Sequence, residues 1–326
     1  MTEQPVGEGG AVAPSATPAS SRTTPAGPVQ DGPPDWKLLL AVTTTVLAWA
    51  SAFVVIRFAG PHFSPGALTL GRLLVGSAVL TLVVAGRRKV RLGRRDRALV
   101  VLIGVAWFGV YNVALNAGEQ HVDAGTAAML IQVAPILIGV LAGSLLGEGF
   151  PRALVVGGLV AFAGTLVIGF ATSTGDADVV GVLLVLLSAV VYAVAMVAQK
   201  VVLRRVPGLQ LTWLACLVGT AATLVFTPTL VTEVRQAPPS ALLGVLYLGV
   251  VPTALAFSTW AYALSRTSAG RLGVTTYVVP PITIGLGWVF LQEVPALLAV
   301  VGGVLSLVGV ALARRPSRPA VPETAA

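Results

Sequence analysis

The sequence predicts an all-α integral membrane protein whose ten transmembrane helices form two inverted five-helix repeats around a central cavity. Three observations lead to this fold. The chain carries too few charges to cover a surface that faces water, its apolar segments are long enough to cross a bilayer ten times, and part of its second half repeats the first.

Charged residues make up 10% of the 326 residues, hydrophobic residues make up 56%, and the mean hydropathy is +0.88. A soluble protein keeps about a quarter of its residues charged, so this surface must face lipid instead. The net charge of +8 does not indicate nucleic-acid binding, because the basic residues lie in short runs between apolar segments. The single cysteine, Cys216, excludes a disulfide or a multi-cysteine metal site within one chain.

Apolar segments follow one another along most of the chain, and a helix needs about 20 such residues to cross the hydrocarbon core. We expect spans at 37–57, 66–86, 98–117, 124–146, 152–172, 179–199, 209–230, 241–264, 269–291 and 296–313. Residues 1–36 are rich in Pro, Gly, Ala, Ser and Thr and are predicted to form a disordered cytoplasmic tail. Residues 314–326 are predicted to form a second cytoplasmic tail, and the two repeats to occupy 37–172 and 179–313.

Lys and Arg gather on one side of these spans. The connection at 86–97, GRRKVRLGRRDR, holds seven basic residues. With ten spans, 18 basic residues fall on one side, only Arg57 and Arg235 on the other, and Arg72 within a span. Because basic connections stay in the cytoplasm, both termini are predicted to be cytoplasmic.

An internal repeat joins the two halves of the chain. Residues 123–167 align without a gap on residues 268–312, at an offset of 145, and the matched pairs include Ala124/Ala269, Gly125/Gly270, Pro135/Pro280, Glu148/Glu293, Gly157/Gly302, Gly158/Gly303 and Gly164/Gly309. The first helix fits the sixth more weakly, at an offset of 143, with Trp49 over Tyr192 and Arg57 over Lys200. Five helices are an odd number, so the second copy inserts with the opposite orientation and the functional site is expected near mid-membrane, where the halves meet.

These motifs resemble a known family. The run WASAFVVIRFAG, from Trp49 to Gly60, is similar to the end of the first helix in EamA-type members of the drug/metabolite transporter superfamily. Arg72 lies where that family often has an arginine, and the ends of both repeats resemble an EamA repeat through Pro135, Glu148, Gly157, Gly158 and their partners Pro280, Glu293, Gly302, Gly303. The resemblance covers about residues 37–313. It implies ten helices around a central cavity and transport of small metabolites, often amino acids or related compounds. The expected location is the bacterial inner membrane.

Two prolines, Pro135 and Pro280, are expected to kink the fourth and ninth helices, because a proline within a helix removes one backbone hydrogen bond. Gln132 and Tyr277 lie next to these kinks and are repeat equivalents, so both are predicted to line the central site. The alternative is that the kinks serve packing alone.

Arg72 is a charged residue inside a span, so its side chain is expected to face a partner or a water-filled cavity, where it could bind an anionic group. The alternative is that the side chain extends to the outer membrane interface. Polar and aromatic residues elsewhere in the spans either line the same cavity or only pack and hydrogen-bond between helices. These further candidates are Trp49, Asn112, Asn116, Trp260 and Tyr262.

Glu148 and Glu293 lie at helix ends, and each is expected to stabilise the first turn of the helix that follows it. No Asp or Glu then remains at mid-membrane to relay protons. A stripe of small residues, Gly139, Gly143 and Gly147, predicts close packing of the fourth helix within the bundle, or alternatively a homodimer contact.

The predicted function is secondary transport of a small molecule by alternating access, with export as the expected direction. The sequence has no GxxxxGK[ST] phosphate loop to use ATP and no HExxH metal motif, and both histidines, His62 and His121, fall in outer loops. We therefore expect no enzyme activity, no cofactor, no metal and no nucleic-acid partner. A channel, or a membrane partner protein that transports nothing, is the alternative.

Overall fold

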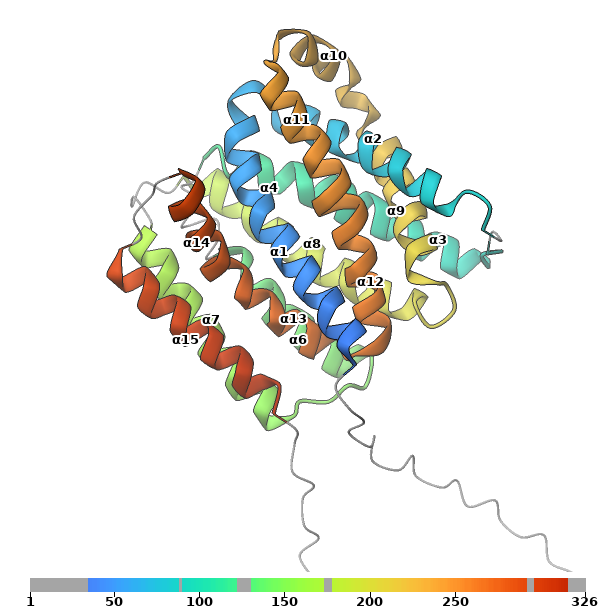
Figure 1. Cartoon of the computed structure of the whole chain (residues 1–326). Coiled ribbons are helices and arrows are strands. Elements are labelled where there is room, and N and C mark those ends of the chain that lie inside the picture. Colours follow the sequence, from blue (N-terminus) through green and yellow to red (C-terminus); the bar gives the residue numbers. More distant parts are fainter. Residues whose placement is uncertain (1–34, 88–89, 122–129, 173–177, 292–295, 316–326) are drawn as a thin grey trace, which may run out of the picture. The chain divides into compact units, whose positions relative to one another are not determined.

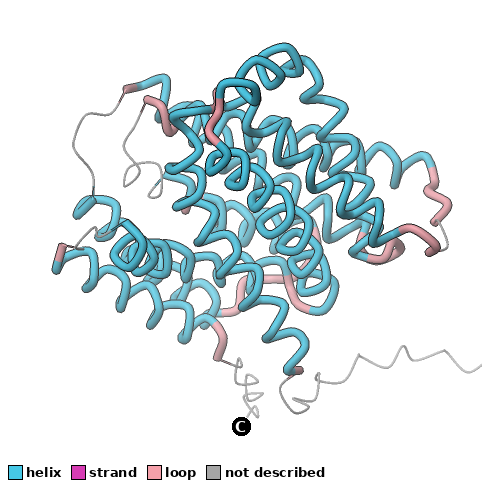
Figure 2. The backbone as a smooth tube through the Cα atoms, turned by 45° about the horizontal axis from the view of Figure 1, so that its top comes forward, coloured by secondary structure: helices cyan, strands magenta, loops and turns pink. Residues whose placement is uncertain are grey.

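The computed structural model describes residues 35–87, 90–121, 130–172, 178–291 and 296–315. The compact unit Trp36–Ala326 is described here by itself. Within these ranges all regular structure is helical and there is no strand (Figures 1 and 2). The predicted tails and Glu293 fall largely or wholly outside the described residues.

The first half of the chain forms a series of long helical segments joined by short connections (Figure 1). They are α1 (Trp36–Ala59), η1 (Gly60–His62), α2 (Pro65–Val84), α3 (Arg94–Ile103), η2 (Gly104–Tyr111), α4 (Asn112–Gly118), α6 (Ala134–Leu145) and α7 (Arg152–Thr172). Pro65 begins α2 where its missing N–H costs nothing, since a first-turn N–H has no partner within the helix.

The second half of the chain is helical too. It consists of α8 (Val179–Val202), α9 (Gly208–Thr223), η3 (Leu224–Phe226), α10 (Thr227–Gln236), α11 (Pro239–Leu248), η4 (Gly249–Leu255), α12 (Ala256–Arg266), α13 (Ala269–Thr275), η5 (Thr276–Val278), α14 (Val279–Leu291) and α15 (Leu297–Ala313). Asp178 caps α8 by accepting a hydrogen bond from the Val180 N–H at 3.0 Å, and Ser268 caps α13 in the same way through the Arg271 N–H.

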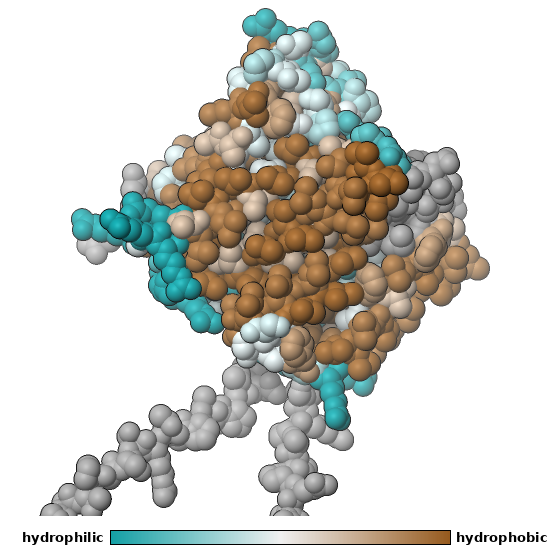
Figure 3. Space-filling model, turned by 180° about the vertical axis from the view of Figure 1, so that it is seen from behind, coloured by the Kyte–Doolittle hydropathy of each residue, from teal (hydrophilic) through white to brown (hydrophobic). Residues whose placement is uncertain are grey.

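The described residues include seven helical segments that are long and apolar enough to cross a membrane, and three shorter apolar helices, α6, α7 and α15. Large apolar side chains lie exposed on the outside of these helices, for example Leu82, Val225 and Leu297. Figure 3 shows this apolar surface as a broad continuous area with hydrophilic residues gathered at its margins. Such a surface matches the hydrocarbon core of a bilayer. The ten-span, inverted-repeat arrangement itself stays a prediction.

Two π-helical segments occupy matching places in the third and eighth predicted spans. Segment η2 begins at Gly104 and η4 begins at Gly249, which is the repeat offset of 145. In η4 the irregularity follows from Pro252, which cannot donate a backbone hydrogen bond. A π-helical turn widens the helix and frequently marks a functional position.

Helices α7 and α15 pack so closely that a side chain at the glycines between them would collide with the backbone of the facing helix. A Cβ added at Gly164 would lie 2.4 Å from the Ser306 nitrogen, and one at Gly309 would lie 2.2 Å from the Ala161 nitrogen. Of the glycine stripe predicted to pack closely, Gly139 and Gly143 lie on α6 and Gly147 follows it. Among the described residues, a Cβ at Gly139 or Gly147 would meet nothing within 4 Å, and the atoms nearest to one at Gly143 belong to the Phe150 ring, so the role of the stripe stays a prediction.

Helices from one half of the chain pack against helices from the other half in the centre of the unit. Helix α1 packs against α11, α12 and α14, while α8 packs against η2, α4 and α6. Helix α2 packs against α9 and η4, closely enough that a Cβ at Gly249 would lie 2.8 Å from the Arg72 carbonyl oxygen. Elements of both halves therefore surround the same central space.

Candidate functional site

A cavity of about 100 Å³ lies between the helices of the two halves. Its walls combine aromatic and aliphatic side chains with a few polar groups, which is the composition expected for a small-molecule site. The lining residues are Trp49, Ala52, Phe53, Ile56, Arg72, Trp107, Tyr111, Asn112, Leu115, Asn116, Ile131, Gln132, Tyr192, Phe257, Thr276 and Val279. Five of the predicted residues are among them: Trp49, Arg72, Asn112, Asn116 and Gln132.

Among the described residues that line the cavity, Arg72 alone carries a formal positive charge, and it is 5% exposed. Its Nε donates a hydrogen bond to the Thr253 hydroxyl at 3.0 Å, and that hydroxyl donates in turn to the Leu248 carbonyl at 2.8 Å. Thr253 thus holds the guanidinium from η4. Within the described residues neither terminal nitrogen of Arg72 has a hydrogen-bond partner, and no lining residue is acidic. The Arg72 guanidinium therefore has N–H donors that no described protein group accepts from.

The two asparagines present the complementary groups. The Asn112 amide nitrogen donates to the carbonyls of Trp107 and Phe108 at 3.0 and 3.1 Å, which belong to the wide turn of η2. The Asn116 amide nitrogen donates to the Thr69 hydroxyl at 3.2 Å. With both nitrogens used, the two side-chain oxygens remain as hydrogen-bond acceptors without a partner in the described part of the chain.

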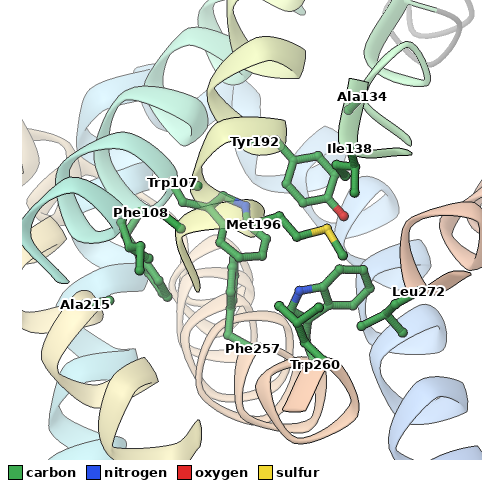
Figure 4. Packing of buried hydrophobic residues seen from close by; sticks show 14 of the residues in the cluster. Trp107, Phe108, Ala134, Ile138, Tyr192, Met196, Ala215, Phe257, Trp260 and Leu272 are labelled. Atoms are coloured by element: carbon green, nitrogen blue, oxygen red, sulfur yellow. The ribbon is translucent and has the colours of Figure 1, made fainter. Parts of the chain in front are cut away.

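Aromatic side chains that line the cavity form a cluster; Figure 4 shows three of them, Trp107, Tyr192 and Phe257, packed together. The Trp107 ring lies 5.0 Å from that of Phe257 and 5.1 Å from that of Tyr192, and the Trp49 ring lies 5.6 Å from that of Phe257. On α1, α2 and α4, every residue that lines the cavity lies in the half of its predicted span that is nearer to the α1–α2 connection. The aromatic cluster therefore forms the floor, and the cavity lies toward the face where α1 meets α2.

Three predicted residues are not among the residues that line this cavity. Trp260 is 1% exposed and lies beyond the floor. Tyr262 lines a separate hollow beside the α8–α9 connection, with the Arg266 guanidinium 3.7 Å from its ring. Tyr277 is fully buried, and its hydroxyl donates to the Gln132 backbone carbonyl at 3.2 Å.

The role of Tyr277 follows from the prolines. Pro135 and Pro280 lie in the first turns of α6 and α14, directly after irregular turns, rather than within a continuous helix. The carbonyl of Tyr277, which Pro281 leaves without its helical donor, accepts a hydrogen bond from the Ser306 hydroxyl at 2.8 Å. Protein groups thus satisfy carbonyls at both breaks, which makes irregular backbone tolerable in a span.

Two ionic groups hold the opposite end of the helices, where α12 meets α13. The Glu148 carboxylate accepts hydrogen bonds from the N–H groups of Ala269 and Gly270 at 2.8 and 3.1 Å. Lys200 donates to the carbonyls of Leu264 and Thr267. The expectation that Glu148 caps the next helix is wrong, because it caps α13 of the other half. Gly147 and Gly149 adopt φ of +69° and +68°, which lets the chain turn sharply around it.

The sequence did not point to the lining residues Tyr111 and Thr276, the repeat equivalent of Ile131. Nor did it point to Thr253, which does not line the cavity but holds Arg72 from behind. Pro252 could have indicated the position of Thr253, because a proline inside an apolar segment predicts an irregular helical turn, and Thr253 lies in that turn.

Apolar helices around a cavity with few polar groups define the class of protein: this is a multi-pass membrane protein with an internal cavity. The chain belongs to the EamA-like transporter family, whose model matches it twice, at residues 36–170 and 179–315. It is a membrane transporter, and the resemblance seen in its motifs is confirmed.

Among its relatives is a Streptantibioticus cattleyicolor protein named "Probable terminal-alkyne amino-acid exporter", 39% identical over 284 residues that cover 86% of this chain and 94% of that one. The "Uncharacterized transporter YdfC" of Bacillus subtilis is 31% identical and covers 84% of this chain and 90% of its own. A solved structure titled "Crystal structure of protein" has the same fold, with a TM-score of 0.70, 23% identity and coverage of 86% and 96%.

Proposed function

We propose that this chain is a secondary transporter of the bacterial cytoplasmic membrane that exports a small amino acid or related compound by alternating access. The observation that carries the proposal is Arg72, a buried cation that lines the cavity and whose terminal nitrogens have no hydrogen-bond partner among the described residues. Ten spans with both termini in the cytoplasm belong to the same proposal, supported by seven long and three shorter apolar helices and by the distribution of basic residues.

The polar groups of the cavity fit the two charged groups of an amino acid. A carboxylate would accept two parallel hydrogen bonds from the terminal nitrogens of Arg72, a geometry that lysine cannot supply. The ammonium group would donate to the free amide oxygens of Asn112 and Asn116. An apolar side chain would then lie against Trp49, Phe53 and the aromatic floor. The relative that is named as an amino-acid exporter agrees with this substrate class.

Transport by purified protein in liposomes tests the proposal. Counterflow of propargylglycine, a small terminal-alkyne amino acid, should saturate with concentration and should accelerate when unlabelled substrate is present on the opposite side. A channel would show flux without saturation, and a partner protein would show none.

Variants at Arg72 connect transport to the cavity. Losing a hydrogen-bonded charge pair in such a site costs about 1.5–3 kcal/mol, which weakens apparent affinity roughly tenfold to a hundredfold in Arg72→Ala. Arg72→Lys should be intermediate because it keeps the charge but loses the paired geometry. Arg235→Ala, at an exposed arginine of α10, is the matched control and should transport normally. Unchanged affinity in Arg72→Ala would refute the assignment.

A further inference from the structure

The repeat register relates the lining of the cavity to a second set of residues. At the offset of 143, Trp49, Phe53 and Ile56 of α1 correspond to Tyr192, Met196 and Gln199 of α8. At the offset of 145, Leu115 of α4 corresponds to Trp260 of α12. The four first-half residues line the cavity, whereas the second-half residues, apart from the Tyr192 ring at the floor, lie beyond it. Figure 4 shows Met196 beside the rings of Tyr192 and Trp260.

We propose that Tyr192, Met196, Gln199 and Trp260 form the cytoplasmic half of the substrate path, which is closed in this structure and opens when the transporter faces the cytoplasm. The inference rests on the proposed function, because it assigns these residues to the alternate state of the same carrier.

The hydrogen bonding of these residues supports the assignment independently of the repeat. In the described part of the chain, three buried side-chain polar atoms lack a partner: the Tyr192 hydroxyl, the Gln199 side-chain oxygen and the Trp260 indole nitrogen. All three belong to the proposed set, and their residues are 6%, 1% and 1% exposed. Leaving a buried polar group unpaired is costly, so such groups are rare and need an explanation. A conformation in which they meet water or substrate supplies one.

The contacts beyond these residues explain how the path is closed. Lys200 lies one position after Gln199 and donates to the Leu264 and Thr267 carbonyls, which end α12. Glu148 binds the first N–H groups of α13. Both groups therefore hold the same α12–α13 connection, one from α8 and one from the end of α6. Opening the path at this end requires that connection to move away from at least one of them.

The two halves of the path differ in charge. Helix α9 holds the segment that matches the region of Arg72, and that segment, QLTWLAC, has no charged residue. The cytoplasmic half thus offers a hydroxyl, an indole N–H and an amide oxygen, but no guanidinium. Such a lining suits a small amphipathic solute whose own charges neutralise each other, as in a zwitterionic amino acid. The cytoplasmic half would bind the solute less tightly than the half that contains Arg72. Solute that enters from the cytoplasm would therefore not be held there.

Cysteine accessibility in the full-length protein tests the proposal. Gln199→Cys and Met196→Cys should react with a membrane-impermeant maleimide added from the cytoplasmic side, in inside-out vesicles. Ala193→Cys is the matched control: Ala193 is equally buried on α8, and its repeat equivalent Ala50 does not line the cavity. It should stay at the background of the wild type, whose single Cys216 is buried. Adding Glu148→Gln should raise the labelling rate at position 199 by about tenfold, the loss of one charge-assisted contact.

The outcomes separate the inference from the proposed function. If both cysteine variants transport substrate yet stay unlabelled from the cytoplasmic side, the path assignment is overturned while the transporter stands. If the labelling follows the prediction but no amino acid moves, the path stands and the substrate class is overturned. Trp260→Phe gives a second reading that does not depend on cysteine: it should raise the KM for substrate on the cytoplasmic side about threefold or more, with binding from the outer side unchanged. An unchanged cytoplasmic KM in both Trp260→Phe and Gln199→Leu also counts against the assignment.

Discussion

The Thr253 hydroxyl is the group on which the position of Arg72 depends, so Thr253→Val is the most informative single change. The hydroxyl is fully buried, accepts from the Arg72 Nε at 3.0 Å and donates to the Leu248 carbonyl at 2.8 Å. Valine has nearly the same shape but can do neither. A hydrogen bond to a charged group contributes about 1.5–3 kcal/mol, so the guanidinium loses its anchor at a cost of this size. Apparent affinity for an amino-acid substrate should fall by roughly tenfold to a hundredfold.

The assay is transport in reconstituted vesicles, with apparent affinity and maximal rate measured separately. Thr253→Ser keeps the hydroxyl and is the matched control, so its affinity should stay within about threefold of the wild type. Thermal unfolding in detergent measures the loss of stability that accompanies either change. If Thr253→Val binds substrate like the wild type while the protein is equally abundant, the guanidinium does not need this anchor, and the account of the site is wrong.

Three further predictions concern packing and closure. Glu148→Gln should shift the carrier toward the state that opens to the cytoplasm, seen as faster limited proteolysis of the α12–α13 connection, whereas an unchanged rate would show that the carboxylate does not hold it closed. Gly164→Val forces a side chain against α15, where a Cβ would already lie 2.4 Å from the Ser306 nitrogen. It should lower the free energy of unfolding by about 1–3 kcal/mol, measured by thermal unfolding. Gly139→Ala, with open space around it among the described residues, is the control. Tyr277→Phe should cost about 1 kcal/mol of stability by leaving the Gln132 carbonyl without its donor, and it should leave substrate affinity intact, because the hydroxyl does not face the cavity.

The sequence predicted the helical class and most of the helix positions, because apolar length and charge distribution are properties of each segment alone. Arg72, Asn112 and Asn116 could be assigned to the interior for a related reason. Polar groups in a lipid-facing position would have no partner, so they had to point inward.

The remaining errors come from geometry that a constant helical period cannot give. The π-helical segments η2 and η4 change the number of residues per turn, so the direction of a side chain such as Trp260 no longer follows from counting. The partner of Glu148 lies 121 residues away in the other half, which is a matter of tertiary structure. Gln132 and Tyr277 were both predicted to line the site because they are repeat equivalents beside the prolines, but only Gln132 does so, and the Tyr277 hydroxyl donates to the Gln132 backbone carbonyl instead.

The central claim is that Arg72 holds the carboxylate of the substrate in the cavity, and a binding cycle that changes both partners tests it most directly. Binding of propargylglycine and of its carboxamide, which lacks the negative charge, should be measured by calorimetry on wild-type protein and on Arg72→Ala. The wild type is expected to prefer the acid by roughly tenfold or more, and Arg72→Ala is expected to bind both ligands equally weakly, since the two losses are coupled. A preference for the acid that persists in Arg72→Ala, or one that is absent from the wild type, would contradict the claim.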